Sequence, residues 1–479
     1  MNSMEPKLLW NYFMELSKIP RGSKQEQAAA QWVADQGKAL GCEVLRDPVG
    51  NVIIKRQATP GREARPAICL QAHVDMVCEK NEGTPHDFLK DPIPVYRDGD
   101  LLKARGTTLG ADNGIGVATA LAVLASTDIP HGPIEVLVTI DEETGMTGAE
   151  NVQAGILKAK YLLNLDSEEE GYLTIGCAGG IDTIATRKVA WGAPKAGNKG
   201  YRLKVSGLKG GHSGIDIANH RGNAIRFLAR TLYHLQQHFE VGIAHVQGGN
   251  KRNAIPREAF ALLALDPAQD AAIRTAVAHV EAESRLAIGA YDPGLAITLE
   301  AVELPGQVMS SSDAQTVVNT LFTMVHGVIA MSPDIPGLVQ TSTNLGVLET
   351  KDGAVTFCML HRSSIDASKM TVVDRVSAHC ALGGFEARHL GGYPGWKPEP
   401  DSDLVKLVKA VHQEMTGKEM KVVAIHAGLE CGIIGEKYPG MEMASIGPDM
   451  WDVHTPDEKV SISSVGRFWE LLKGILTKM

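Results

Sequence analysis

Short apolar runs that end at acidic or histidine residues recur along the first third of the chain. Three of them, at 67–70, 134–140 and 161–165, have the length and the near-continuous apolar character of strands buried in a sheet. In open α/β sheets, ligands bind beyond the carboxyl ends of the strands, so polar residues that follow different strands converge there. The pattern therefore predicts one site at one end of a sheet.

Helical segments alternate with these runs. A Ser-Lys-Gln-Glu capping box at 23–26 precedes a predicted helix at 28–40, and a Gly- and Ala-rich helix at 114–124 begins just after Asp112. An amphipathic helix is expected within the first 20 residues, and two further strands around 43–45 and 51–55. The first 180 residues thus read as an α/β unit.

Two Gly- and Pro-rich stretches, at 191–200 and 391–400, mark changes of domain. The residues after the first stretch alternate as in a half-exposed antiparallel strand, whereas the second is followed by a helix and an apolar strand. We therefore predict an α/β domain with a mostly parallel central sheet flanked by helices, and an α+β domain inserted into it. The predicted limits are 1–185 and 389–479 for the first domain and 186–388 for the insert. Within the insert, 253–266 and 344–362 show a faint duplication.

The composition and charge of the chain limit the classes of binding partner that we expect. The chain has 479 residues and a formal net charge of −9, and no basic run could neutralise phosphates, so nucleic acid and anionic membranes are not expected partners. Seven cysteines without CxxC pairs form no disulfide framework, which fits a reducing cytoplasm. No signal-peptide cleavage site and no stretch long enough to span a membrane is evident. We expect a small-molecule partner.

The residues at the predicted strand ends can hold two divalent metal ions. A two-metal site needs one bridging carboxylate and terminal ligands on each side. We assign Asp112 as the bridge. If strand geometry persists through 141–143, adjacent side chains cannot point the same way, so Glu143 can bind metal while Glu142 acts as the general base. Asp75 would orient a ligand imidazole. Oxygen and imidazole donors suit Zn, Co or Mn. The terminal ligands would be His73 and Asp166 for one metal, and Glu143 and His454 for the other.

Other motifs in the chain give little or no support to nucleotide binding or to covalent catalysis. Gly114 and Gly116 resemble part of a dinucleotide fingerprint, but Thr119 occupies the third small position, and no P-loop is present. The Gly-Gly-His-Ser-Gly segment at 210–214 is equally consistent with a flexible turn and with a reactive histidine in a mobile loop. No Gly-x-Ser-x-Gly elbow is present, and no cysteine has an evident histidine partner, so covalent catalysis has little support.

The motif series resembles that of the M20 metallopeptidases along essentially the whole chain. His73-x-Asp75, Asp112 after Gly110, Glu142-Glu143, Asp166 and His454 occur in the order and at the separations of that family. Three longer motifs, at 210–216, 253–258 and 426–432, are most similar to those of its bacterial dipeptidases.

The resemblance implies two Zn ions, an inserted lid domain, and the metal and catalytic roles assigned above. It further implies that His212 of the lid stabilises an oxyanion, that Arg362 binds the substrate carboxylate, and that Asn253 and His426 contact substrate. A cis peptide after Asp112 and a homodimer are also implied. The expected reaction is hydrolysis of dipeptides with free termini, Xaa-His among them, by a water that gives its proton to Glu142. Closure of the lid would assemble His212 and Arg362 against the metals.

Two alternatives stay open. An N-acyl amino acid amidase or deacetylase of the same clan would share the metals but would not recognise a free α-amine. A non-catalytic, metal-dependent binding protein would have no use for a base such as Glu142 beside the metals. Cleavage of Ala-His compared with N-acetyl-His separates the enzymes.

Overall fold

The computed structural model describes residues 4–479, and the chain divides into two compact units. Unit 1 comprises Met1–Gly176, Trp396–Ala424 and Leu429–Met479, and unit 2 comprises Cys177–Gly395 and Ile425–Gly428. The domain limits predicted at 185/186 and 388/389 lie within about ten residues of the two main junctions and stay a prediction. The short return of 425–428 to unit 2 was not expected.

Unit 1 is built on an eight-stranded sheet with parallel strands at its centre. Neighbours β6, β3, β7 and β23 run parallel, whereas the pairs β1–β2, β2–β6 and β23–β8 are antiparallel. The sheet is therefore mixed, with the predicted parallel strands in the middle. In spatial order the strands are β1 (Glu43–Arg46), β2 (Val52–Arg56), β6 (Ile134–Thr139), β3 (Ile68–His73), β7 (Tyr161–Asn164), β23 (Glu442–Ser445), β8 (Tyr172–Cys177) and β22 (Lys421–Ile425).

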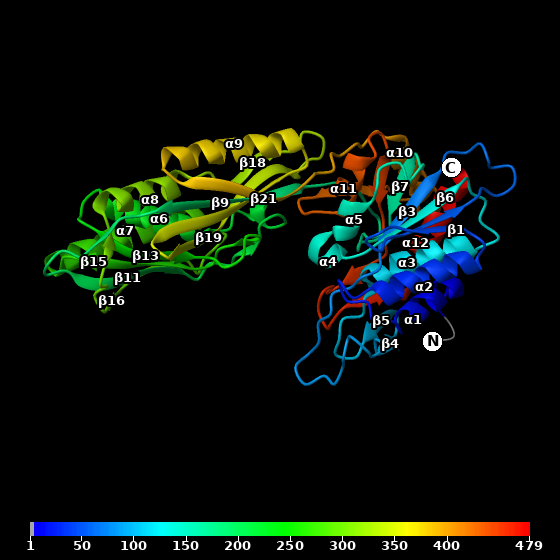
Figure 1. Cartoon of the computed structure of the whole chain (residues 1–479), viewed down its shortest axis with the longest axis horizontal. Coiled ribbons are helices and arrows are strands. Elements are labelled where there is room, and N and C mark those ends of the chain that lie inside the picture. The colour runs from blue at the N-terminus through cyan, green and yellow to red at the C-terminus, as the bar shows by residue number, and fades with distance from the viewer. Residues whose placement is uncertain (1–3) are drawn as a thin grey trace. The chain divides into compact units, whose positions relative to one another are not determined.

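Helices flank this sheet (Figure 1). Helix α3 is buried from Ala111 to Leu124, and its small side chains let it pack closely on β3, while α2 packs on β1 and β2 and α10 on β23. Every residue of β3 and β6 is buried, which explains their continuous apolar runs. The helices are α1 (Lys7–Leu16), α2 (Gln27–Ala39), α3 (Ala111–Ala125), α4 (Glu142–Gly145), α5 (Thr147–Asn151), α10 (Asp403–Thr416), α11 (Glu430–Lys437) and α12 (Ile462–Lys478). A second sheet has the order β24 (Met450–Trp451), β25 (Lys459–Ser461), β5 (Leu101–Ala104), β4 (Val95–Asp98).

Unit 2 contains an antiparallel sheet made of two lobes with the same topology. Each lobe runs strand, helix, strand, strand, helix, strand, and the second strands of the two lobes, β13 and β19, pair to make the sheet continuous. The two segments that look faintly alike in the sequence each end in the third strand of a lobe, β15 or β20, but they begin at different places, because Asn344 lies within β19 and Asn253 outside the strands. The inner lobe is β11 (Lys199–Ser206), α6 (Ala224–Gln236), β13 (Gly242–Gly248), β15 (Ala259–Leu265), α7 (Asp270–Ile288) and β16 (Ala296–Val302). The outer lobe is β9 (Gly179–Lys188), α8 (Ser311–Thr323), β19 (Val339–Lys351), β20 (Ala354–Ser363), α9 (Asp366–Leu382) and β21 (Glu386–Tyr393).

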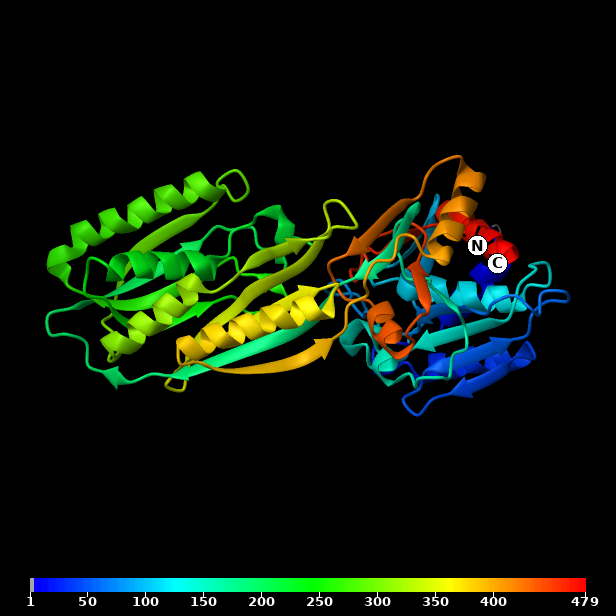
Figure 2. The ribbon, with the colours of Figure 1, turned by 90° about the horizontal axis from the view of Figure 1, so that it is seen from above.

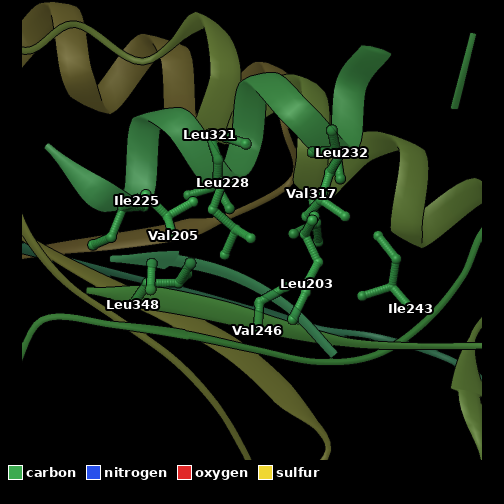
Figure 3. Packing of buried hydrophobic residues seen from close by; sticks show 14 of the residues in the cluster. Leu203, Val205, Ile225, Leu228, Leu232, Ile243, Val246, Val317, Leu321 and Leu348 are labelled. Atoms are coloured by element: carbon green, nitrogen blue, oxygen red, sulfur yellow. The ribbon is translucent and has the colours of Figure 1, made fainter. Parts of the chain in front are cut away.

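The helices of unit 2 cover one face of this sheet, and α9 lies along β9 and β21 (Figures 1 and 2). Figure 3 shows how Leu228 and Leu232 of α6 and Leu321 of α8 pack toward Leu203 and Val246 on the strands. Burial of such side chains stabilises the fold by roughly 1.5–3 kcal/mol each. Shorter elements are β18 (Gly327–Met331) beside β19, the pairs β10 (Trp191–Gly192) with β17 (Val308–Met309) and β12 (Gly211–His212) with β14 (Ala254–Ile255), and 3-10 turns at Ile217–Asn219 and Pro267–Gln269. Among the described helices, none combines the length and apolar character needed to cross a membrane.

Candidate metal centre

His73 ends strand β3, and its imidazole is 1% exposed. Its Nε2 lies 3.1 Å from Oδ1 of Asp112 and 3.4 Å from Oδ1 of Asp166. Its Nδ1 lies 3.3 Å from Oδ1 of Asp75, at ion-pair distance but outside hydrogen-bond geometry. Residues that follow β3 and β7 and residues at the start of α3 thus meet in unit 1, as the pattern of strand ends predicts.

His454 approaches the same aspartate from the other side. Its Nε2 lies 3.0 Å from Oδ2 of Asp112 and 3.0 Å from Oε2 of Glu143. Asp112 therefore presents one carboxylate oxygen to His73 and Asp166 and the other to Glu143 and His454, which is the arrangement that a bridging carboxylate requires. The peptide bond between Asp112 and Asn113 is cis, as the family resemblance implies.

This donor set fits divalent cations. Ligand atoms of His73, Asp112 and Glu143 all lie within 4.8 Å of one another. Two buried oxygens, Oε1 of Glu143 and Oδ1 of Asp166, accept no hydrogen bond from the described residues. A buried carboxylate is costly unless it is paired, hydrogen-bonded or bound to metal. Imidazole and carboxylate donors in this number suit Zn, Co or Mn.

The electrostatics of these residues have a common cause, which is several carboxylates in a buried place. Burial raises the pKa of Asp166 to about 7, and the charges of Asp112 and Glu143 add to the effect. Burial, followed by the charge of Asp166 and other neighbouring carboxylates, also holds the pKa of Glu142 well above its usual range. Hydrogen bonds to Asp112 and Glu143 raise the pKa of His454 to about 11. The site therefore carries an excess of negative charge that bound cations would compensate.

Glu142 lies in the first turn of a helix, so the expectation that strand geometry separates it from Glu143 is wrong. Strand β6 ends at Thr139, and Asp141 adopts a left-handed conformation (φ 52°) from which α4 begins. The carboxylate of Asp75 accepts the backbone N–H groups of Glu142 at 3.0 Å and Glu143 at 3.2 Å. Asp75 thus fixes the first turn of α4 and with it both glutamates.

Ser23 is a supporting residue that the sequence interpretation misassigned. Its hydroxyl donates to Oδ2 of Asp75 at 2.8 Å instead of capping α2. Helix α2 begins after Glu26, and no side chain caps its N-terminus. The predicted capping box is therefore wrong. A nearby carboxylate is the stronger acceptor, but it comes from a segment about fifty residues further along the chain.

A buried carboxylate and a buried guanidinium hold the segment that carries Asp112. Arg21, 1% exposed, donates to the carbonyl oxygens of Val74 and Gly110. Gly110 has φ +69°, and a Cβ there would lie 2.4 Å from the guanidinium of Arg21, so only glycine fits. Glu458 accepts four consecutive backbone N–H groups, from Leu109 (2.7 Å), Gly110 (2.9 Å), Ala111 (2.7 Å) and Asp112 (3.3 Å). Sequence gave no signal for these residues, because their partners are backbone atoms of distant segments.

Glu168 is a further carboxylate beside the centre. It belongs to the acidic run at 168–170, in which Glu169 is exposed. Glu168 is partly buried: burial, followed by the charge of Asp112, raises the pKa of Glu168 to about 7. It forms no ion pair with any residue in the described part of the chain.

His212 lies in unit 2, on the two-residue strand β12. Its Nδ1 accepts the backbone N–H groups of Gly214 at 3.2 Å and Ile215 at 3.1 Å, so the neutral ring carries its proton on Nε2. Burial and the charge of Arg362 lower the pKa of His212. These contacts hold the turn at 212–215 in one conformation, and the role of His212 stays a prediction.

Unit 2 also brings Arg362 and His426 near His212. Arg362, 5% exposed, donates from Nη1 to the hydroxyl of Tyr393 at 3.0 Å. His426 lies with Nε2 2.7 Å from the hydroxyl of Ser342, and burial, then the charges of Arg362 and His212, lower the pKa of His426 to about 3. Asn253 is exposed, and its backbone carbonyl accepts the N–H of the residue after His212. The roles of these residues stay predictions.

Fold and site together define a metal-dependent hydrolase of the two-cation class. The family model for peptidase family M20/M25/M40 matches residues 69–478, and the chain belongs to this family. It is 41% identical over its full length, and over 99% of the relative, to the cytosol non-specific dipeptidase of Escherichia coli (strain K12). The crystal structure of aminoacylhistidine dipeptidase from Vibrio alginolyticus matches with a TM-score of 0.95 at 43% identity, covering 100% of this chain and 98% of that one. Aminopeptidase PepT from Bacillus cereus shares the fold at 18% identity, with a TM-score of 0.58 and 99% of both chains covered.

Proposed function

We propose that the protein is a dipeptidase that hydrolyses dipeptides with free termini, Xaa-His among them. The observation that carries this proposal is the shared carboxylate of Asp112, with Glu142 held next to one of the proposed ligands. The full-length similarity to a non-specific dipeptidase and to an aminoacylhistidine dipeptidase supports it.

The cofactor is proposed to be two divalent ions, with Zn as the first choice and Co or Mn as alternatives. His73 and Asp166 would hold one ion, Glu143 and His454 the other, and Asp112 both. Such ions supply Lewis acidity and lower the pKa of water. Glu142 takes a proton from the attacking water and returns it to the leaving amine. Asp75 orients Glu142 through the two N–H groups at the start of α4.

Residues of unit 2 have chemistry that suits the remaining needs of the reaction. His212 offers an N–H donor at Nε2 for the developing oxyanion. Arg362 offers a guanidinium, already oriented by Tyr393, for the C-terminal carboxylate of the substrate. We propose substrate-contacting roles for Asn253 and His426 as well.

Glu168 distinguishes a dipeptidase from an N-acyl amidase. Its carboxylate has no ion-pair partner among the described residues and is close enough to Asp112, Glu143 and His454 to interact with their charges. The free α-ammonium group of a dipeptide would be such an ion-pair partner. We propose that Glu168 recognises the substrate amine, which an N-acylated amino acid lacks.

The test compares three substrates with the metal-stripped protein and the protein reloaded with Zn, Co or Mn. Metal-dependent cleavage of Ala-His, but not of N-acetyl-His or Ala-Ala-His, is the expected result. Cleavage of N-acetyl-His alone would make the protein an amidase, and bound metal without any cleavage would favour a binding protein. We further propose a cytoplasmic location and a homodimer, the latter to be tested by analytical ultracentrifugation.

A further inference from the structure

Unit 2 contains a cavity of about 450 Å³ bordered by β11, β13, β14 and β15. Four cationic side chains and one carboxylate line it, which leaves three net positive charges in a chain whose formal net charge is −9. Such a local excess attracts anions and concentrates them. The charged lining residues are Arg202, Lys204, Lys251, Arg257 and Glu258.

Most of these cations have no anionic partner in the part of the chain that the structure describes. Glu258 pairs with Lys204 at 3.3 Å. Across residues 4–479, no ion pair or side-chain hydrogen bond involves Arg202, Lys251 or Arg257. The Nε of Arg202 is buried and accepted by nothing in that range. A buried donor without an acceptor is unfavourable, so the cavity gains from an anion that supplies one.

The aromatic residue of the cavity does not offer a stacking surface for a nucleobase. The guanidinium of Arg202 lies over the ring of Phe260, 4.3 Å from its centroid. The imidazole of His245 also stacks on this ring, at 5.5 Å and an interplanar angle of 28°. The ligand chemistry that remains is therefore compact and anionic.

We propose that this cavity binds a phosphate-bearing anion of the pyrophosphate class. A phosphate group carries about −1.5 to −2 charges near neutral pH, so two linked groups match the net charge of the lining. Arginine binds phosphate through two parallel N–H donors, and lysine through a compact charge, so the lining offers both modes.

The site is built on the strand pair that carries His212. Gly211, Ala254 and Ile255 line the cavity, and Gly211 and His212 pair with Ile255 and Ala254 across β12 and β14. The stem of Arg257 packs on the segment before this pair, since a Cβ at Gly210 would lie 2.3 Å from its Cγ. An anion held by Lys251 and Arg257, which flank β14, thus restrains the β12–β14 strand pair that carries His212. Occupancy of the cavity is a means of regulating that histidine.

Calorimetric titration of the metal-loaded protein with pyrophosphate tests this proposal. Because pyrophosphate also binds divalent metals, the diagnostic quantity is the number of sites lost on substitution. The double variant Lys251→Gln, Arg257→Gln should lose one site per chain, or bind it at least tenfold more weakly, and keep its metal content. Arg202→Gln should weaken the same site. The control Lys188→Gln changes an exposed lysine of the same unit outside the cavity and should bind as the unchanged protein does.

Hydrogen exchange supplies a second readout that needs no enzymatic activity. Pyrophosphate should slow amide exchange in the peptides that contain 210–216 and 250–258, and the double variant should abolish this effect. Equal stoichiometry and affinity in the unchanged protein and the double variant would overturn the site. Tighter binding of citrate than of pyrophosphate would overturn the phosphate assignment. Binding without slower exchange would overturn the link to His212. None of these outcomes depends on dipeptide hydrolysis, so failure of the proposed function would be seen separately.

Discussion

Two buried polar clusters, one around Asp112 in unit 1 and one around His361 in unit 2, are satisfied in opposite ways. In unit 1, carboxylates crowd around Asp112, and one oxygen each of Glu143 and Asp166 has no hydrogen-bond donor among the described residues. In unit 2, the fully buried His361 has both ring nitrogens within 2.8 Å of threonine hydroxyls, those of Thr343 and Thr183. The first arrangement is incomplete without added cations, whereas the second is satisfied within the protein.

The largest effect is expected from Glu142→Gln. The variant keeps the shape and the proposed metal ligands but cannot accept a proton, so kcat for Ala-His should fall by roughly 10²- to 10⁴-fold. Metal content, measured by mass spectrometry, should be unchanged. The control Glu169→Gln alters an exposed glutamate of the nearby acidic run and should leave kcat as it is. A Glu142→Gln enzyme with full activity would remove the general base from the mechanism.

Removal of metal should destabilise unit 1 and spare unit 2. A ligand present at a thousand times its Kd stabilises the folded state by about 4 kcal/mol, and chelation removes that contribution. Hydrogen exchange after chelation should therefore accelerate in peptides of β3, α3 and α4, and stay constant in those of β19 and β20. Equal acceleration in both units would contradict the contrast.

Glu458→Gln tests how unit 1 prepares its centre before any metal binds. The amide keeps one acceptor oxygen but loses the charge that four N–H groups share, so the segment of Asp112 loosens. Metal affinity should fall by about 10- to 100-fold, the usual effect of losing a supporting partner of a ligand. Competition with a chromophoric chelator measures this. Glu470→Gln, at an exposed glutamate paired with Lys473, should not change metal affinity.

Acid should weaken unit 2 through its buried histidines. Burial, followed by the charge of His389, lowers the pKa of His361 to about 3. The unfolded state binds the proton more readily than the folded state does, so acid favours unfolding. The stability contributed by the neutral, buried His361 is therefore complete above about pH 6.5 and is lost as pH falls toward 3. At pH 5 the free energy of unfolding is lower by about 2 kcal/mol for this reason. Urea unfolding followed by pulse-labelled exchange of β20 should show it, and His361→Gln should reduce the difference between pH 7 and pH 5.

The smallest effect is expected from Tyr393→Phe. Removing the hydroxyl leaves Arg362 without its oriented partner at a cost of about 1 kcal/mol, which corresponds to a roughly fivefold higher KM with little change in kcat. Tyr291→Phe, at a half-exposed tyrosine of the same unit, is the matched control. A change confined to kcat would argue that Tyr393 acts elsewhere.

Strand ends were predictable from sequence because the central strands of the sheet in unit 1 are buried on both faces. Continuous apolar runs located β3, β6 and β7, and the residues that follow them proved to be neighbours. The turn after β6 was not predictable, because a left-handed Asp141 converts an expected strand into the first turn of a helix.

Residues whose side chains bind backbone atoms of distant segments could not be recognised from the sequence. Arg21 and Glu458 are ordinary charged residues in isolation, and only the folded chain brings them to the segment of Asp112. The lobes of unit 2 were equally hidden. Strand β9 pairs with β20, from which the whole inner lobe separates it in sequence, so no local pattern joins them.

The inner lobe leaves and rejoins the outer lobe at one place, where Trp191 pairs with Met309 and the N–H of Ser310 donates to the carbonyl of Ala190 at 2.7 Å. The inner lobe is therefore an insertion whose first and last residues lie next to each other in the folded protein. A direct connection from Ala190 to Ser310 would span no gap. It would unpair β19 only at Leu348 and Glu349, which pair with β13, and β18 would still pair with residues 339–343 of β19. A single deletion could thus shorten the inserted domain without changing the course of the remaining chain.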